Sequence, residues 1–335
     1  MKKEIGIDLG TSNTIIYMKS KGIVLDEPSV VAIDRETGTV LAVGNAAKEM
    51  IGKTPESIMA VNPLKDGVVA DYMAAHSMLK YFIKKAYKKT GIIKPKVIIN
   101  VPVGVTSVER RAVEDAAISA GAREVFLIES PMAAALGADM PVNDAIASMV
   151  VDVGGGVTEV AVISLGGIVT SKTVRVAGDT FCDDIIRYIK LNHNLIIGRP
   201  TAEAIKTTIA SVINDGSVEV IEVKGRDSIT GLPKNIEFSS SEACEAINSS
   251  VLKIIDAIKI TLEETPPELS SDILERGIVI LGGSSFLKGI SKLIERETGM
   301  QILLPETSRE AVALGMGRVM DKSNSFKKDL IIKHK

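Results

Sequence analysis

The chain has 335 residues, which is long enough for two domains with separate hydrophobic cores. Its 45% hydrophobic and 24% charged residues are ordinary for a globular protein, and a net charge of −2 gives no electrostatic argument for binding nucleic acid. Asp8 interrupts the first apolar run too early for a signal peptide, and no apolar run approaches the ~20 residues of a membrane span. We therefore expect a cytoplasmic protein with reduced cysteines.

The first element is a buried strand at 4–9 that runs into a tight turn and a second strand at 13–18. Glycine lets the backbone approach a ligand closely, and successive N–H groups of a turn form a concavity that binds anions. The segment therefore predicts a phosphate-binding hairpin, with these turn residues: Gly10, Thr11, Ser12 and Asn13.

The rest of the first half alternates strands and helices. A polar, turn-rich stretch at 44–70 indicates a small inserted lobe, and Thr106 with Glu109 predicts a capping box. Strands are expected at 29–33, 39–43, 97–101 and 124–129, and helices at 71–89, from Thr106 to Gly121 and from Pro131 onward.

Residues 149–158 repeat the opening pattern of an apolar run, Asp, an apolar residue and Gly. One such copy could be only a tight turn, but both copies share the preceding strand and a following β-prone run. We interpret them as the two halves of a nucleotide clamp that arose by internal duplication. Asp8 and Asp152 would direct a hydrated Mg²⁺, and the second turn would cradle phosphate with Gly154, Gly155 and Gly156.

A third glycine turn follows the buried strand at 277–281 and precedes a helix-like stretch at 286–297. Such a turn suits the sugar or α-phosphate end of a nucleotide, although it is neither a P-loop nor a Rossmann fingerprint. Its residues are Gly282, Gly283, Ser284 and Ser285. The remaining elements of this half are strands at 158–164 and 168–176, helices at 181–192, 201–212, 241–264 and 308–320, and a β-prone excursion at 218–238.

These motifs resemble those of the MreB family, bacterial homologues of actin in the wider group of actin, heat-shock chaperones and sugar kinases. The resemblance implies an α/β, actin-like ATPase fold with two duplicated domains around a nucleotide cleft, each with a smaller inserted subdomain. It is carried by residues 7–14, 22–32, 63–68, 107–112, 151–156, 176–179 and 201–203.

Domain I would span 1–141 with an inserted lobe at about 32–66, and the C-terminal helix at 308–335 would return to it. Domain II would span 142–307 with a lobe at about 178–240.

The resemblance implies ATP-driven filaments at the inner face of the cell membrane that organise cell-wall synthesis and rod shape with partner proteins. By position, the first two glycine turns would hold the phosphates of Mg-ATP. Glu203 and Lys206 would flank the adenosine together with residues 282–285, although their residue types alone suit a solvated helix face.

Two departures from the family pattern concern catalysis. Ser130 stands where the family has Glu before Pro131, and Val157 stands where it has Thr. Both family residues are suited to orient the attacking water, so we expect slow hydrolysis. Glu129 should face the opposite side of its strand, while Thr158 or a shifted Glu could fill the role instead. A third departure, at Ser284, Ser285 and Phe286, would alter the nucleoside pocket.

A membrane contact is expected from Ile92 and Ile93, which occupy the position of a short hydrophobic loop in the family. The alternative is a loop packed on its own domain, and the tail at 326–333 is a second candidate.

Two other functions of the same superfamily are alternatives. A sugar or metabolite kinase would need a substrate base in the first domain's cleft, and no distinctive Asp-bearing loop indicates one. A chaperone ATPase would need a peptide-binding domain after residue 335.

Overall fold

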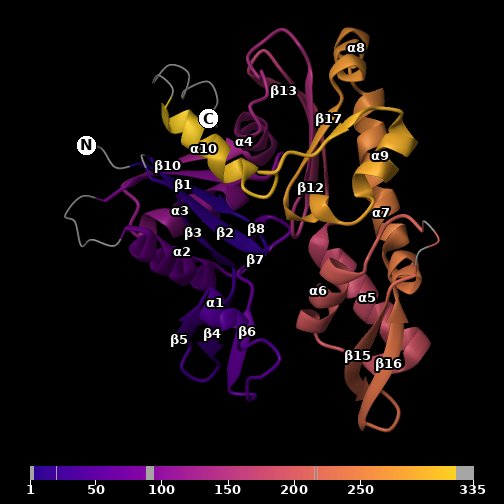
Figure 1. Ribbon diagram of the computed structural model, residues 1–335. Coiled ribbons are helices and arrows are strands. Elements are labelled where there is room, and N and C mark those ends of the chain that lie inside the picture. The colour runs from indigo at the N-terminus through magenta and orange to yellow at the C-terminus, as the bar shows by residue number, and fades with distance from the viewer. Residues whose placement is uncertain (1–3, 20, 88–93, 215, 217, 322–335) are drawn as a thin grey trace.

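The computed structural model describes residues 4–19, 21–87, 94–214, 216 and 218–321. Figure 1 shows the indigo-to-purple N-terminal part beside the magenta-to-orange part. Helices α4 (Ser130–Gly137) and α10 (Ala311–Asp321) pack against each other where the two parts meet. Backbone contact there is close, because a Cβ on Gly315 would lie 1.8 Å from the carbonyl oxygen of Ala133.

The N-terminal part is built on a five-stranded sheet of order β10-β9-β1-β2-β3. Strands β1 to β3 form an antiparallel meander, and β9 and β10 run parallel to β1. Helix α2 (Tyr72–Tyr87) buries Met78, Leu79 and Phe82 in this core, next to α3 (Ser107–Ser119). The strand bounds are Glu4–Leu9 for β1, Asn13–Met18 for β2, Gly22–Pro28 for β3, Lys96–Val101 for β9 and Glu124–Glu129 for β10.

The second part repeats this arrangement in a sheet of order β13-β12-β11-β17-β18. An antiparallel meander of β11, β12 and β13 is again followed by two parallel strands. Every residue of β12 is buried, because helices α4 and α7 (Ser240–Glu263) both contact it. The strand bounds are Ser148–Val153 for β11, Thr158–Ser164 for β12, Gly167–Val174 for β13, Ile278–Leu281 for β17 and Ile302–Leu303 for β18.

Two smaller lobes lie at the same end of the molecule (Figure 1). The first contains the sheet of β5 (Val40–Val43), β4 (Val31–Asp34) and β6 (Ile58–Val61), with helix α1 (Asn45–Lys48). The short pair β7 (Leu64–Lys65) and β8 (Val68–Val69) lies outside this lobe, where Leu64 and Val69 pack on the core of the larger sheet (Figure 1). The second contains β14 (Leu195–Ile196), β15 (Val220–Asp227) and β16 (Pro233–Ser239), beside α5 (Gly178–His193) and α6 (Arg199–Thr208).

Several predicted elements are confirmed, among them the capping box of α3, in which Glu109 N donates to Thr106 Oγ1 at 3.2 Å. Three predictions were wrong. Strand β3 was missed because its charged Asp26 and Glu27 conceal the apolar pattern; Glu27 is buried in an ion pair of 2.5 Å with Lys85. The helix expected at 286–297 begins only at Ile290, because Gly289 before it has a positive φ and cannot be part of the helix. The helix observed is α9 (Ile290–Thr298), and the 3₁₀ turn η1 (Gly283–Phe286) precedes it.

The third error concerns the C-terminal region, where helix α8 (Pro267–Arg276) was not anticipated and α10 begins at Ala311 rather than at 308. Each helix among the residues that the structure describes is too short or too polar to span a lipid bilayer. Ile92, Ile93 and the tail at 326–333 lie outside the described residues.

Candidate functional site

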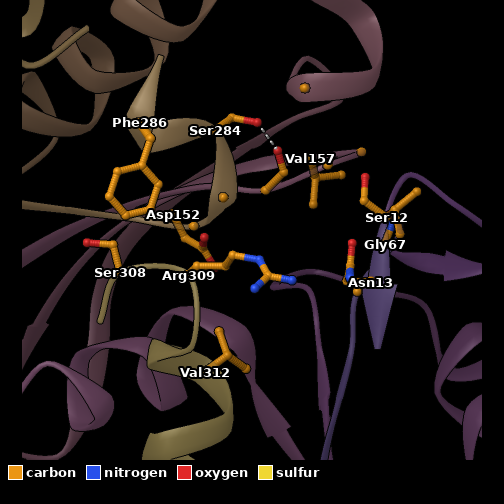
Figure 2. A pocket seen from close by; sticks show the side chains of 18 of the residues that line it. Ser12, Asn13, Gly67, Asp152, Val157, Ser284, Phe286, Ser308, Arg309 and Val312 are labelled. Carbon is orange, nitrogen blue, oxygen red and sulfur yellow. Dashed lines mark hydrogen bonds between the residues drawn. The ribbon is translucent and has the colours of Figure 1, made fainter. Parts of the chain in front are cut away.

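The glycine turns of the two sheets face each other across a cavity of about 370 Å³ (Figure 2). Nearly all residues proposed from the sequence line it, although they come from segments far apart in the chain. They are Asp8, Thr11, Ser12, Asn13, Ser130, Asp152, Gly154, Gly155, Gly156, Val157, Glu203, Lys206, Gly282, Gly283 and Ser284. Ser285 does not line it: its side chain is buried, its Oγ donates to Gly282 O at 2.6 Å, and it borders a neighbouring cavity.

The two turns interlock because the glycines of one leave room for the side chains of the other. A Cβ on Gly155 would lie 2.1 Å from Ser12 Oγ, and one on Gly156 would lie 2.6 Å from Thr11 Oγ1. Gly67 N donates to the same Thr11 hydroxyl at 3.1 Å and brings a third segment to the turn. Backbone amides and small polar side chains thus converge from both halves, as a bound polyphosphate requires.

Two carboxylates stand behind the turns, Asp8 on β1 and Asp152 on β11. Burial, with a smaller contribution from the charge of Asp152, raises the pKa of Asp8 to about 8. Burial alone raises the pKa of Asp152 to about 6. Neither has a cation close enough to form a salt bridge within the described part of the chain. Both open onto the cavity, so a divalent cation there would relieve the repulsion between them.

A third acidic group, Glu159 on β12, was missed by the sequence analysis. Its Oε1 accepts a hydrogen bond from Val103 N at 2.8 Å, and burial raises its pKa to about 8. Glu159 lies opposite Asp152 in the β11–β12 hairpin, so the register of the predicted hairpin could have indicated it.

Ser130 begins α4 and lines the cavity, whereas Glu129 is the last residue of β10 and is absent from the lining. Asn100 Nδ2 donates to Ser130 Oγ at 3.1 Å, and Ser130 also hydrogen-bonds the Glu159 carboxyl. Val157 presents only methyl groups to the cavity (Figure 2). The Ser130 hydroxyl and the Glu159 carboxyl, which lie nearest to the positions of the family's Glu and Thr, are therefore already hydrogen-bonded within the protein.

The other end of the cavity combines charged and apolar groups. Lys206 Nζ on α6 donates to Glu203 Oε2 at 2.7 Å and to Gly178 O at 3.2 Å. Ser284 Oγ donates to Gly154 O at 2.8 Å, which ties the third glycine turn to the second (Figure 2). Phe286 is half-exposed and offers a ring for a planar base to stack against.

Arg309 is a further cavity residue that no sequence signal indicated. It lies just before α10, and Figure 2 shows its side chain extending between Asp152 and Asn13. Its Nη2 contacts the Asp26 carboxylate on β3 at 2.7 and 2.8 Å.

The comparisons with known proteins agree with this geometry. The chain is 47% identical to the cell shape-determining protein Mbl of Bacillus subtilis, over 97% of this chain and 98% of Mbl. It is also 47% identical to the cell shape-determining protein MreB of Escherichia coli, over 98% of this chain and 96% of MreB.

Solved structures give the same result. The crystal structure of MreB 5 of Spiroplasma citri bound to AMPPNP has a TM-score of 0.92 and 36% identity, covering 98% of each chain. A MamK double helical filament has a TM-score of 0.81 at 21% identity, covering 96% of this chain and 100% of MamK, and supports the actin-like fold alone. The family model described as MreB/Mbl protein matches residues 2–328. The chain therefore belongs to the MreB/Mbl family and has its actin-like fold.

Proposed function

We propose that this chain binds Mg-ATP between its two halves and assembles into actin-like filaments that help to determine cell shape. The observation that carries the proposal is the interlocked pair of glycine turns in front of Asp8 and Asp152. The relative from Spiroplasma citri was solved with AMPPNP and with ADP, which supports a nucleotide in the corresponding place.

The residues present fit a hydrated Mg²⁺. Asp8 and Asp152 are buried carboxylates facing one cavity, and each is destabilised in its ionised form without a cation. Within the described residues, no cluster of three or more His, Cys, Asp or Glu side chains could hold a metal directly. Mg²⁺ keeps several of its waters and needs few protein ligands when phosphates supply others. When bound, the ion would neutralise phosphate charge, while Asp8 and Asp152 would accept hydrogen bonds from its waters.

We place the phosphates at Thr11, Ser12, Asn13 and residues 154–156, and the adenosine beside Glu203, Lys206 and the third glycine turn. The lining of the cavity supports this polarity. The end near the turns has backbone amides and the carboxylates that would hold Mg²⁺, and the other end has Phe286 and the paired Lys206.

Hydrolysis in this site is proposed to be slow. Water attack depends on a residue that orients the water, and neither Val157 nor Ser130 provides a carboxylate there. Glu159 is the nearest carboxyl, but it is held by Val103 N and its raised pKa keeps it largely protonated at neutral pH. A protonated carboxyl is a poor acceptor for a proton of the attacking water.

We further propose that the filaments act at the inner face of the cell membrane, with partner proteins of wall synthesis. The family's membrane loop corresponds to Ile92 and Ile93, which could contribute roughly 3–6 kcal/mol if fully inserted. Many such weak contacts add along a filament. Liposome co-sedimentation of the double variant Ile92→Ser, Ile93→Ser against wild type tests this step, and unchanged sedimentation would remove the loop from the proposal.

The main test measures binding and assembly separately. Mg-ATP should raise the melting temperature of wild type, because a ligand of the folded state alone stabilises it by mass action. The double variant Asp8→Asn, Asp152→Asn keeps the side-chain volumes and should lose most of this shift with Mg-ATP. Electron microscopy with Mg-ATP should show linear filaments. A double variant that binds Mg-ATP as wild type does would refute the metal site, and protein that stays monomeric in all nucleotide states would refute the cytoskeletal role.

A further inference from the structure

The charges that line the cavity are unequally distributed. Three of its side chains are cationic, Lys206, Lys288 and Arg309. Lys206 is bound to Glu203 at 2.7 Å, and Lys288 is bound to Glu219 at 2.8 Å. Both lie toward the base end with α6 and the third glycine turn. The phosphate end, by contrast, holds the carboxyls of Asp8, Asp152 and Glu159, which repel a nucleoside di- or triphosphate.

Arg309 is the cation that can reach that end. It projects into the cavity between Asp152 and Asn13 (Figure 2), and its charge lies close enough to Asp8 to lower that carboxyl's pKa, against the larger effect of burial. Its side chain is 40% exposed, so it has room to reorient. Guanidinium carries five donors in a planar fork, which suits phosphate oxygens.

Breaking the ion pair between Arg309 and Asp26 requires little free energy. Asp26 is 30% exposed, and Asn13 Nδ2 donates to Asp26 Oδ1 at 2.9 Å. When the guanidinium turns away, the carboxylate therefore keeps one donor from the phosphate-binding turn and the rest from solvent. A second contact, from Arg309 Nη1 to Glu310, spans 3.7 Å and is weak. A phosphate chain in the cavity would compete with both carboxylates for the same guanidinium.

We propose that Arg309 is a phosphate-binding residue of this site, and that it exchanges its ion pair with Asp26 for contacts to the phosphate chain of a bound nucleoside di- or triphosphate. This inference rests on the proposed nucleotide function and adds to it a residue outside the three glycine turns. The exchange also couples the ligand to the segment before α10, because Arg309 leaves β3 when phosphate is present.

The test compares the affinities of ATP, ADP and adenosine, measured with Mg²⁺ by competition against a fluorescent ATP analogue. Arg309→Gln should weaken ATP and ADP by roughly tenfold, as expected for one charge-assisted hydrogen-bonded contact, and should leave adenosine within about twofold. Arg309→Lys should retain most of the affinity because it keeps the charge. Asp26→Asn should strengthen ATP binding by a few-fold, since it removes the competing carboxylate.

Arg175→Gln is the matched control. Its guanidinium lies 3.9 Å from Asp66, beside the cavity residue Gly67, but Arg175 does not line the cavity. This variant should bind all three ligands as wild type does, and melting curves without ligand should show that every variant is folded.

The possible outcomes separate this inference from the proposed function. If wild type binds none of the ligands, the proposed nucleotide site fails. If wild type binds ATP and Arg309→Gln binds it equally well, the role of Arg309 is refuted while the site stands. An equal loss for adenosine and ATP would also refute it, because Arg309 would then shape the nucleoside pocket. A fall in ATP affinity for Asp26→Asn would overturn the exchange.

Discussion

The two glycine hairpins have the same strand arrangement, but their turns present different groups to the cavity. In both, a buried strand carries an Asp and leads into a tight turn and an antiparallel strand. The β1–β2 turn presents the side chains of Thr11, Ser12 and Asn13, whereas the β11–β12 turn presents bare backbone at residues 154–156. A duplicated fold has thus produced complementary turns, because two turns that both carried side chains could not approach so closely.

The surroundings of the two Asp residues also differ. Asp8 lies near Asp152, Asp26 and Arg309, and its pKa is raised further than that of Asp152, for which burial is the one resolved cause. Two residues in equivalent strand positions therefore have different proton affinities. Their local sequences, Asp-Leu-Gly and Asp-Val-Gly, give no hint of it.

The largest effect is expected from Gly155→Ala, which would break the complementarity of the turns. The new methyl group would lie 2.1 Å from Ser12 Oγ and 2.8 Å from Ser12 Cβ, so the halves could not close fully. We expect about 2–3 kcal/mol of lost binding, near a hundredfold in Mg-ATP affinity.

Adding Ser12→Gly to Gly155→Ala should restore part of the affinity, because it removes both clashing atoms. Calorimetry on the four proteins of this double-mutant cycle gives the coupling between the turns. Strictly additive effects would mean that the turns do not meet in solution.

The next largest effect is expected on the rate of ATP hydrolysis, through the positions next to the β11–β12 turn. Restoring the family residues with Ser130→Glu and Val157→Thr should speed phosphate release by about tenfold to a hundredfold, at or below the lower end of the usual range for a positioned acid or base. ATP affinity should change little. The variant Glu129→Gln serves as a control, since Glu129 does not line the cavity. No gain in the double variant would show that these positions do not limit the reaction.

A smaller effect should distinguish Asp8 from Asp152 by how each changes the free energy of unfolding with pH. A carboxyl whose pKa is raised in the folded state stabilises the fold below its unfolded pKa, near 3.8, and this stability is lost as the pH rises through the folded pKa. For Asp8 the loss therefore continues to about pH 8, and for Asp152 it ends near pH 6.

Ligand-free Asp8→Asn should consequently gain stability over wild type between pH 6 and 8, by about 1–2 kcal/mol because the carboxyl opens onto the cavity. Asp152→Asn should gain less over that range. Urea unfolding at several pH values measures both differences. A pH-independent difference for Asp8→Asn would contradict its raised pKa.

The smallest effect should come from features that the halves do share. Thr106 caps α3 with Glu109, and Ser239 caps α7 with Glu242 in the same reciprocal arrangement. Thr106→Ala and Ser239→Ala should each lower the free energy of unfolding by about 1 kcal/mol. Glu242 also contacts His193 at 2.7 Å, so the second cap has further support. Unequal losses of more than about 1 kcal/mol would show that the caps are not equivalent.

The sequence by itself determined the elements whose signals are local. Buried strands, glycine turns and the Thr106 capping box are each encoded within about ten residues, and the duplicated Asp-x-Gly pattern indicated two halves facing one cleft. The lining residues of the three turns followed from the same local patterns, apart from Ser285, whose direction depends on the 3₁₀ turn that contains it.

Only the tertiary structure decided which distant side chains join those turns. Asn100 comes from strand β9, whose partners could not be read from the chain, and Arg309 approaches Asp26 across 283 positions. The charged strand β3 became visible only through its pairing with β2, which leaves Glu27 buried in an ion pair with Lys85. The physical reason is that burial, charge proximity and steric fit depend on distances in space, which local periodicity does not contain.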